Sequence, residues 1–433
     1  MTTDILRELI NNEKQTRYTG YSLESIILLL DKLGNPHRKI KCIHIAGTNG
    51  KGSTAWFLNT IFQAAGYKTG LYTSPHLHSV NERMLVDNEP IDDEVLGNYL
   101  TKIREVMNSF PTITPTYFDV LTAAAFFFFH ESSVDIAIIE TGLGGIKDST
   151  NIIIPLCSII TDISLDHTSI LGETIDKIAA EKAGIIKKNI PVITSNHDPE
   201  IRDILLRESK SMGSRLLTLG EDFRCARIPS MPHHVCFNYD FNYSNEEIHL
   251  QNVNLQSPVH EQMRNASLAL TAAIMLMPVF KKLSLETMRM AVSDTQVPGR
   301  FFIIQETPPV IFDPAHNPSA IRALIETIRV KYMLGRIYAI ITVMKDKDYE
   351  DIFNLLEGSS IPILYYYGPG DDNRSYDPEI EGHPRFHSIS RDEHQLLKNI
   401  TGLPVDNRVL LFTGSFRIYD TALSITEKLI SSL

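Results

Sequence analysis

A glycine-rich segment near residue 50 has the composition of a phosphate-binding loop. It reads Ile45-Ala-Gly-Thr-Asn-Gly-Lys-Gly-Ser-Thr54 and joins a strand-like apolar run to a helical pattern. In such a turn, backbone N–H groups converge at the positive end of the helix dipole, which favours anions. Lys51 would supply charge for the β- and γ-phosphates of a nucleotide, and Ser53 or Thr54 a hydroxyl near a metal ion. A simple turn would not need three glycines with a lysine between them, although the spacing differs from the common phosphate loop.

Three possible metal ligands stand where predicted strands end. Ser74 follows a strand over residues 69–73, Glu140 ends one over 134–140, and His167 follows one over 156–161. In a doubly wound sheet, the carboxyl ends of the strands line one ligand-binding crevice. A hydroxyl, a carboxylate and an imidazole, with water and a phosphate oxygen, would suit octahedral Mg²⁺. Taken singly, each has a structural explanation: a turn serine, a solvated acid and a core histidine.

Lys182 lies on a predicted helix over residues 174–183, beside Glu181 and just before Gly184. A lysine in the last turn of a helix is ordinarily solvated and complements the helix dipole. Its position alone therefore predicts a structural lysine.

The elements that must position these residues alternate between strand and helix. Over the first 200 residues this alternation predicts an α/β fold with a mostly parallel, doubly wound sheet. Residues 222–257, rich in Asn, Tyr and Pro, indicate a small β excursion at its edge. Val297-Pro-Gly-Arg300 interrupts the pattern before a second alternation begins. We predict an ATP-binding domain over residues 1–296 and a smaller α/β, Rossmann-like domain over 297–433.

Composition limits the partners. The chain has 433 residues, a formal net charge of −11 and 43% hydrophobic residues, as expected of a soluble globular protein. The acidic balance argues against nucleic acid, because neutralising phosphates requires a basic surface. The longest nearly apolar run, Val120–Phe129, is shorter than the ~18 residues that span a bilayer. Four scattered cysteines fit a reducing compartment, so we expect a cytoplasmic protein that binds no membrane.

The glycine-rich loop resembles that of the Mur ligase superfamily, in the form found in the folylpolyglutamate synthase/dihydrofolate synthase family. Further blocks follow in the order expected of that family and cover nearly the whole chain. They are Leu71–Leu77, Asn81–Arg83, Thr116–Asp119, Glu140–Gly145, Asp148–Asn151, Leu165–Thr168, Glu181–Ile185, Pro298–Phe301, Phe312–Pro318 and Thr413–Phe416.

This resemblance implies an ATP-dependent ligase that activates a folate carboxylate as an acyl phosphate and adds L-glutamate to it. It also implies reaction with dihydropteroate and a monomeric protein with small-molecule substrates. The loop Gly47, Thr48, Asn49, Gly50, Lys51, Gly52 and Ser53 would bind ATP together with Asn265, Arg300 and Asp313. The folate would contact Thr116, Tyr117, Phe118 and Asp148.

The remaining roles also come from the resemblance. Ser74, Glu140 and His167 would bind Mg²⁺, and a carbamylated Lys182 would bind a second Mg²⁺. Carbamylation requires a neutral amine, hence a lowered pKa at a partly buried position. His316 and Ser415 would hold the incoming glutamate. Lys51, Lys182 and His316 would be the catalytic residues.

The chain departs from the family pattern at the acceptor side. Ile146-Lys147-Asp148 stands where Arg-Leu-Asp is common, and a lysine does not replace an arginine geometrically. One alternative is therefore a related amide ligase with another carboxylate acceptor or amino acid. A second is a nucleotide-binding regulator without turnover, which would not need Glu140, His167, Lys182 and His316 together.

Overall fold

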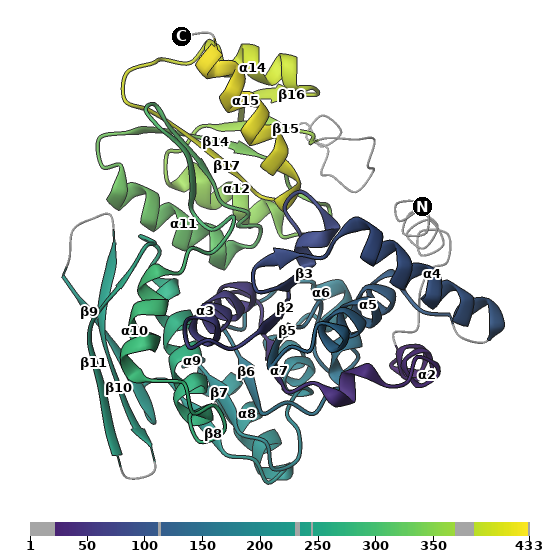
Figure 1. Cartoon of the computed structure of the whole chain (residues 1–433). Helices are drawn as coiled ribbons and strands as arrows, with labels where there is room; N and C mark the ends of the chain where they lie inside the picture. Colours follow the sequence, from purple (N-terminus) through teal and green to yellow (C-terminus); the bar gives the residue numbers. More distant parts are fainter. Residues whose placement is uncertain (1–21, 111–113, 230–233, 244–245, 369–384, 432–433) are drawn as a thin grey trace.

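The computed structural model describes residues 22–110, 114–229, 234–243, 246–368 and 385–431. It contains an eight-stranded, a three-stranded and a six-stranded sheet, with helices packed against them (Figure 1). We call the part built on the first two sheets the N-terminal unit and the part built on the third the C-terminal unit. The α/β class predicted from the alternation of strands and helices is confirmed.

The eight-stranded sheet has the order β4-β3-β2-β5-β1-β6-β7-β8. Its six parallel strands are β1 (Cys42–Ala46), β2 (Thr69–Tyr72), β5 (Ile136–Glu140), β6 (Cys157–Ile160), β7 (Val192–Thr194) and β8 (Leu216–Thr218). An antiparallel extension, β3 (Met84–Val86) and β4 (Glu89–Pro90), lies at one edge. The carboxyl ends of β2, β5 and β6 therefore meet on either side of β1.

Both faces of this sheet are covered, because every residue of β1, β2, β5 and β6 is buried. In β1, Ile43 and Ile45 face one core cluster while Cys42 faces another, following the two-residue period of a strand. One face carries α3 (Lys51–Ala64), α9 (Glu261–Leu276) and α10 (Leu285–Asp294); the other carries α2 (Glu24–Lys32), α4 (Asp93–Ser109) and α5 (Tyr117–Glu131). Three further helices belong to the part of the chain that carries the later strands, namely α6 (Thr168–Leu171), α7 (Ile175–Ala183) and α8 (Pro199–Ser211).

Helix α5 carries four consecutive phenylalanines, and Phe126, Phe127 and Phe129 are buried. A Thr116–Asp119 capping box starts this helix. The phenylalanines are thus core residues of a helix that is buried on several sides.

The predicted β excursion is a separate antiparallel sheet of β9 (Phe223–Ile228), β10 (Val235–Tyr243) and β11 (Glu246–Leu255). Its apolar side chains join the core cluster of α9 and α10, outside the eight-stranded sheet (Figure 1).

The C-terminal unit has the strand order β12-β13-β17-β14-β15-β16. The strands are β12 (Phe302–Glu306), β13 (Pro309–Phe312), β14 (Arg336–Ile341), β15 (Ile363–Tyr366), β16 (Phe386–Ser390) and β17 (Arg408–Thr413), and only the β12–β13 pairing is antiparallel. One core cluster includes α11 (Pro318–Lys331) and α12 (Tyr349–Gly358), and another includes α14 (Glu393–Thr401) and α15 (Tyr419–Ser431). Among the described residues, no helix has the length and apolar character to cross a membrane.

Candidate active site

The glycine-rich loop connects β1 to α3, which begins at Lys51. Two of its glycines are required by the fold around them. Gly47 has φ +154°, and a Cβ there would lie 1.8 Å from Oγ1 of Thr161. Gly50 has φ +89°, and a Cβ there would lie 2.3 Å from Oδ1 of Asn265. Only glycine combines these backbone angles with such close neighbours.

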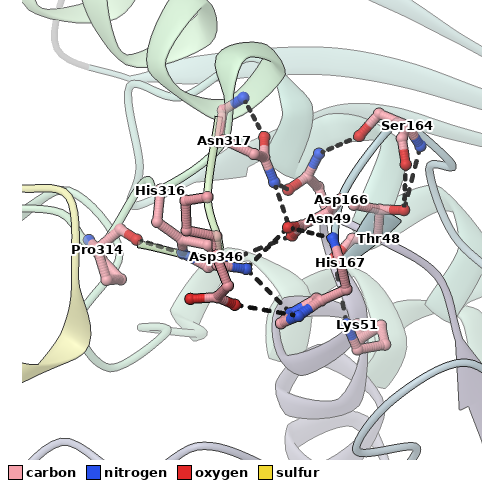
Figure 2. Close-up of polar contacts among 12 residues, drawn as sticks. Thr48, Asn49, Lys51, Ser164, Asp166, His167, Pro314, His316, Asn317 and Asp346 are labelled. Atoms are coloured by element: carbon pink, nitrogen blue, oxygen red, sulfur yellow. Dashed lines mark hydrogen bonds and ion pairs between the residues drawn. The ribbon is translucent and has the colours of Figure 1, made fainter. Parts of the chain in front are cut away.

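Side chains and backbone groups after β6 hold the loop in place. The Asn49 amide donates to Oδ2 of Asp162 at 3.1 Å and to the Ser164 hydroxyl at 3.1 Å. The Thr48 hydroxyl donates to the Ser164 carbonyl at 3.0 Å (Figure 2). The backbone N–H of Thr48 donates to the Asp162 carbonyl at 2.6 Å. The loop is therefore ordered by the protein's own contacts. Helix α9 adds a bond from the Gln262 amide to the Ser53 hydroxyl at 3.1 Å.

Two lysines converge on this loop. Nζ of Lys51 donates to the carbonyls of Gly47 and Thr48, both at 3.1 Å, and Nζ of Lys182 donates to the Gly47 carbonyl at 2.8 Å. Lys182 is only 4% exposed, so the solvated helix-end lysine expected from position alone is wrong. Burial, and then the charge of Lys51, lower the pKa of Lys182 to about 7. A neutral amine is therefore well populated near neutral pH.

Glu140 is buried at the end of β5, where its Oε2 accepts the N–H of Ser74 at 3.0 Å. Burial raises the pKa of Glu140, while the charge of Lys51 opposes that shift. A buried carboxylate of this kind is stabilised by cations placed against it. Ser74 thus meets Glu140 through its backbone, as neighbouring strand ends of one sheet should.

His167 has a left-handed backbone conformation, with φ +50°, and caps the short helix α6. Its Nε2 lies 3.0 Å from Nζ of Lys347, and its Nδ1 lies 3.7 Å from Oδ2 of Asp346. Figure 2 shows the imidazole facing Asp346, which belongs to the C-terminal unit. Burial, followed by the charge of Lys347, lowers the pKa of His167 to about 4, so the ring is neutral at pH 7.

Two adjoining cavities occupy the carboxyl edge of the large sheet. The nucleotide-side cavity, of about 290 Å³, is lined by the loop, Glu140, Lys182, Asn265 and Arg300. The acceptor-side cavity, of about 790 Å³, extends toward α5 and the C-terminal unit. They share a wall that includes Ser74, Gly142, Leu143, His167, His316 and Phe416. A group bound in one cavity therefore lies next to a group bound in the other.

The C-terminal unit contributes to both cavities. Arg300 lies over the Phe416 ring, 5.2 Å from its centroid, and lines the nucleotide side. Asp313 also lines that side, but its carboxylate accepts the N–H groups of Phe301 at 2.9 Å and Ala315 at 3.0 Å. Ser415 lines the acceptor side. His316 lines both sides, and its Nδ1–H donates to the Pro314 carbonyl at 2.8 Å (Figure 2).

The four predicted folate contacts divide into two groups. Thr116, Phe118 and Asp148 line the acceptor-side cavity, whereas the Tyr117 ring faces the Arg83 guanidinium at 5.8 Å. Asp148 also holds its own turn together, because its carboxylate accepts N–H groups of Leu143 at 2.8 Å and Thr150 at 3.0 Å. Lys147, from the segment that departs from the family pattern, is exposed and lines the same cavity.

Comparisons with known proteins agree with this geometry. Residues 45–273 match the Mur ligase middle domain, and residues 299–416 match the Mur ligase glutamate ligase domain. The dihydrofolate synthase/folylpolyglutamate synthase of Bacillus subtilis is 35% identical, over 89% of this chain and 90% of its own. A folylpolyglutamate synthase of Lacticaseibacillus casei is 33% identical, over 80% and 81%. The chain belongs to the dihydrofolate synthase/folylpolyglutamate synthase family of Mur ligases.

Solved structures of the family agree over the whole length. The folylpolyglutamate synthase of Thermotoga maritima superposes with a TM-score of 0.81, at 29% identity and over 100% of this chain and 97% of that one. A structure described as E. coli FolC in complex with DHPP and ADP gives 0.84, at 28% identity and over 100% and 98%. The expected membership in this ligase family is confirmed, and the chain is an ATP-dependent ligase.

The sequence did not predict that Asp166 contacts several residues of the C-terminal unit. Asp166 lies in the Leu165–Thr168 block, but the family resemblance implies no role for it. Its carboxylate lies 2.7 Å from Nζ of Lys347, 3.7 Å from Nε2 of His316 and 3.4 Å from the Asn317 amide. All three partners come from the C-terminal unit. The acidic residue next to a candidate ligand was a visible signal, but its partners lie 150 or more residues away.

Proposed function

We propose that this chain joins the amine of L-glutamate to the carboxylate of a folate, using ATP, through an acyl phosphate. The observation that supports this most directly is the shared wall of the two cavities, where His316 lines both. A carboxylate reaching this wall from the acceptor side would stand next to the γ-phosphate of a nucleotide on the loop. Placing two reactants in contact is the main protein contribution to a phosphoryl transfer.

On the nucleotide side, the backbone of the loop from Gly47 to Ser53 would hold the phosphates, and Lys51 would neutralise their charge. Asn265 and Arg300 would contact the nucleotide from α9 and from the start of the C-terminal unit. Asp313 would lie near the ribose. We assign the division between the nucleotide domain and the glutamate-ligase domain to residues 296 and 297.

Residues at the shared wall and on its nucleotide side fit Mg²⁺. Glu140 is a buried carboxylate with a raised pKa, and His167 is a neutral imidazole whose Nε2 already faces a cation, the Lys347 ammonium. Ser74, Glu140 and His167 would hold the ion, and a carbamate on Lys182 would add a ligand for a second. Among the described residues, no three His, Cys, Asp or Glu side chains gather as a ready-made metal site. Bound Mg²⁺ would supply positive charge against the phosphates.

The reaction then follows two balanced steps. The folate carboxylate oxygen attacks the γ-phosphorus, the bond to the β-phosphate oxygen breaks, and ADP leaves. The glutamate amine attacks the acyl carbon, loses a proton and expels inorganic phosphate. Ser415 and His316 would position the glutamate, and the C-terminal unit would exclude water from the acyl phosphate. Thr116, Phe118 and Asp148 would frame the folate, with Tyr117 supporting Arg83.

A second candidate is the same reaction with another carboxylate acceptor, which the exposed Lys147 at the acceptor cavity favours. ADP release, measured with ATP, L-glutamate and either dihydropteroate or a reduced folate, tests both candidates. We expect glutamate-dependent ADP release with a reduced folate and with dihydropteroate. Release with neither acceptor would favour another acceptor, and nucleotide binding without turnover on any carboxylate would favour a regulator.

A further inference from the structure

Lys347 lies in the loop between β14 and α12 of the C-terminal unit and enters the N-terminal unit. Its side chain is 8% exposed. Its ammonium lies 2.7 Å from Oδ1 of Asp166 and 3.0 Å from Nε2 of His167. It also borders the acceptor-side cavity, whereas Asp166 borders the nucleotide side. Lys347 therefore stands at the junction of the two cavities and of the two units.

The hydrogen bond to His167 has only one possible direction. An ammonium carries three donors and no acceptor, so Nε2 must accept through its lone pair. The ring proton of the neutral imidazole is then on Nδ1, which faces the Asp346 carboxylate at 3.7 Å. A metal ion would coordinate the same Nε2 lone pair, because Nδ1 carries the proton. One lone pair serves one of these two partners at a time.

We propose that the Lys347 ammonium and a divalent cation compete for Nε2 of His167, so that docking of the Lys347 loop and cation binding oppose each other. This inference rests on the metal-binding role proposed for His167. Competition at one atom is a coupling between two binding events, and such coupling acts equally in both directions. A cation at His167 displaces Lys347 from the imidazole, and a docked Lys347 raises the cation concentration that is needed.

A purely structural role for Lys347 would have different consequences. As an ordinary ion pair with Asp166, it would hold the two units together without affecting cation binding. The hydrogen bond from Lys347 to Nε2 of His167 distinguishes competition from a purely structural role, because the ion pair with Asp166 does not require it. Lys345, two residues earlier in the same loop, is exposed and provides a matched control with the same charge.

The test measures the Mg²⁺ concentration that gives half-maximal binding of β,γ-methylene-ATP at a fixed analogue concentration. We expect Lys347→Met to lower this concentration about tenfold, within the range typical of coupling between sites. Lys345→Met should leave it unchanged. Lys347→Gln keeps a donor for Asp166 but removes the charge, so it should shift the concentration in the same direction by less. This second variant serves if the methionine variant does not fold.

A His167→Ala background separates the competition from the metal-binding proposal. If His167 binds the cation, His167→Ala should raise the Mg²⁺ requirement, and Lys347→Met should then cause no further change. An unchanged requirement in His167→Ala would refute the metal-binding role and, with it, the competition. An altered requirement in His167→Ala, but equal values for wild type, Lys347→Met and Lys347→Gln, would overturn the competition alone.

Discussion

The nucleotide-side and acceptor-side cavities share a wall but are built differently. The first depends on glycines with restricted surroundings and on buried groups such as Glu140 and Lys182. Both are lined from both units, but the border of the second also includes the exposed Lys147. Buried groups placed to neutralise phosphate thus line the nucleotide side, whereas the acceptor side includes an exposed lysine on its border. We therefore expect substitutions of the buried nucleotide-side groups to change the rate of the reaction, and substitution of the exposed border residue to change the affinity for the acceptor.

The strongest test of this contrast is Glu140→Gln, on the nucleotide side. We expect turnover to fall by about 10²-fold or more, because one negative charge is lost from a site that organises cations around phosphate. The glutamine oxygen can still accept the N–H of Ser74, so the melting temperature should change little. Steady-state ADP release and thermal melts measure the two effects. A near-normal rate would remove Glu140 from the proposed metal site.

Lys182→Ala should have the next largest effect, a loss of turnover of about 10²-fold. Partial recovery with a short added carboxylate would indicate that a carbamate is the working group. Lys177→Ala is the matched control, because Lys177 lies on the same helix α7 and is exposed. Equal turnover rates for the Lys182→Ala and Lys177→Ala variants would show that Lys182 has no catalytic role.

On the acceptor side, Lys147→Met should act on affinity alone. We expect KM for the folate acceptor to rise about two- to fivefold with kcat nearly unchanged, since an exposed ion pair contributes little. The KM for ATP should stay constant. A fall in kcat for this variant would break the contrast, because the acceptor border would then contribute to chemistry.

The prediction for His44 concerns the stability of the protein rather than its turnover. It is fully buried in β1, where Nε2 lies 2.8 Å from the Thr150 hydroxyl, linking the strand behind the loop to the turn beside the acceptor cavity. Burial, then the charge of Lys187, lowers the pKa of His44 to about 3. The folded state therefore binds fewer protons than the unfolded state between about pH 6.5 and 3, and stability falls as pH falls through this range.

This contribution should approach a slope of about 1.4 kcal/mol per pH unit. His44→Gln removes the titrating group and keeps a donor for Thr150. The variant should show a shallower loss of unfolding free energy from pH 6 to pH 4, measured by urea denaturation, and no change in slope above pH 7.5. Identical acid slopes would show that His44 does not titrate on unfolding.

Parts of the nucleotide side differ in how far the sequence could predict them. The loop was readable because its glycines, Lys51 and the flanking strand and helix are contiguous in the chain. The alternation of apolar strands and helices likewise predicted both α/β units. The contacts of Asp166 could not be predicted from the sequence, because they depend on how α11 and the Lys347 loop pack against the segment that follows β6. The burial of Lys182 also depends on tertiary packing, because its position in the last turn of a helix predicts a solvent-exposed side chain.

The bonds that hold Thr48 and Asn49 to the segment after β6 have a consequence for the time course of nucleotide binding. A loop that must become ordered around its ligand loses conformational entropy at the moment of association. Here that loss has already occurred during folding, through bonds to Asp162 and Ser164. The association rate of the nucleotide should then depend on diffusion and on access past the C-terminal unit, rather than on a conformational change of the loop.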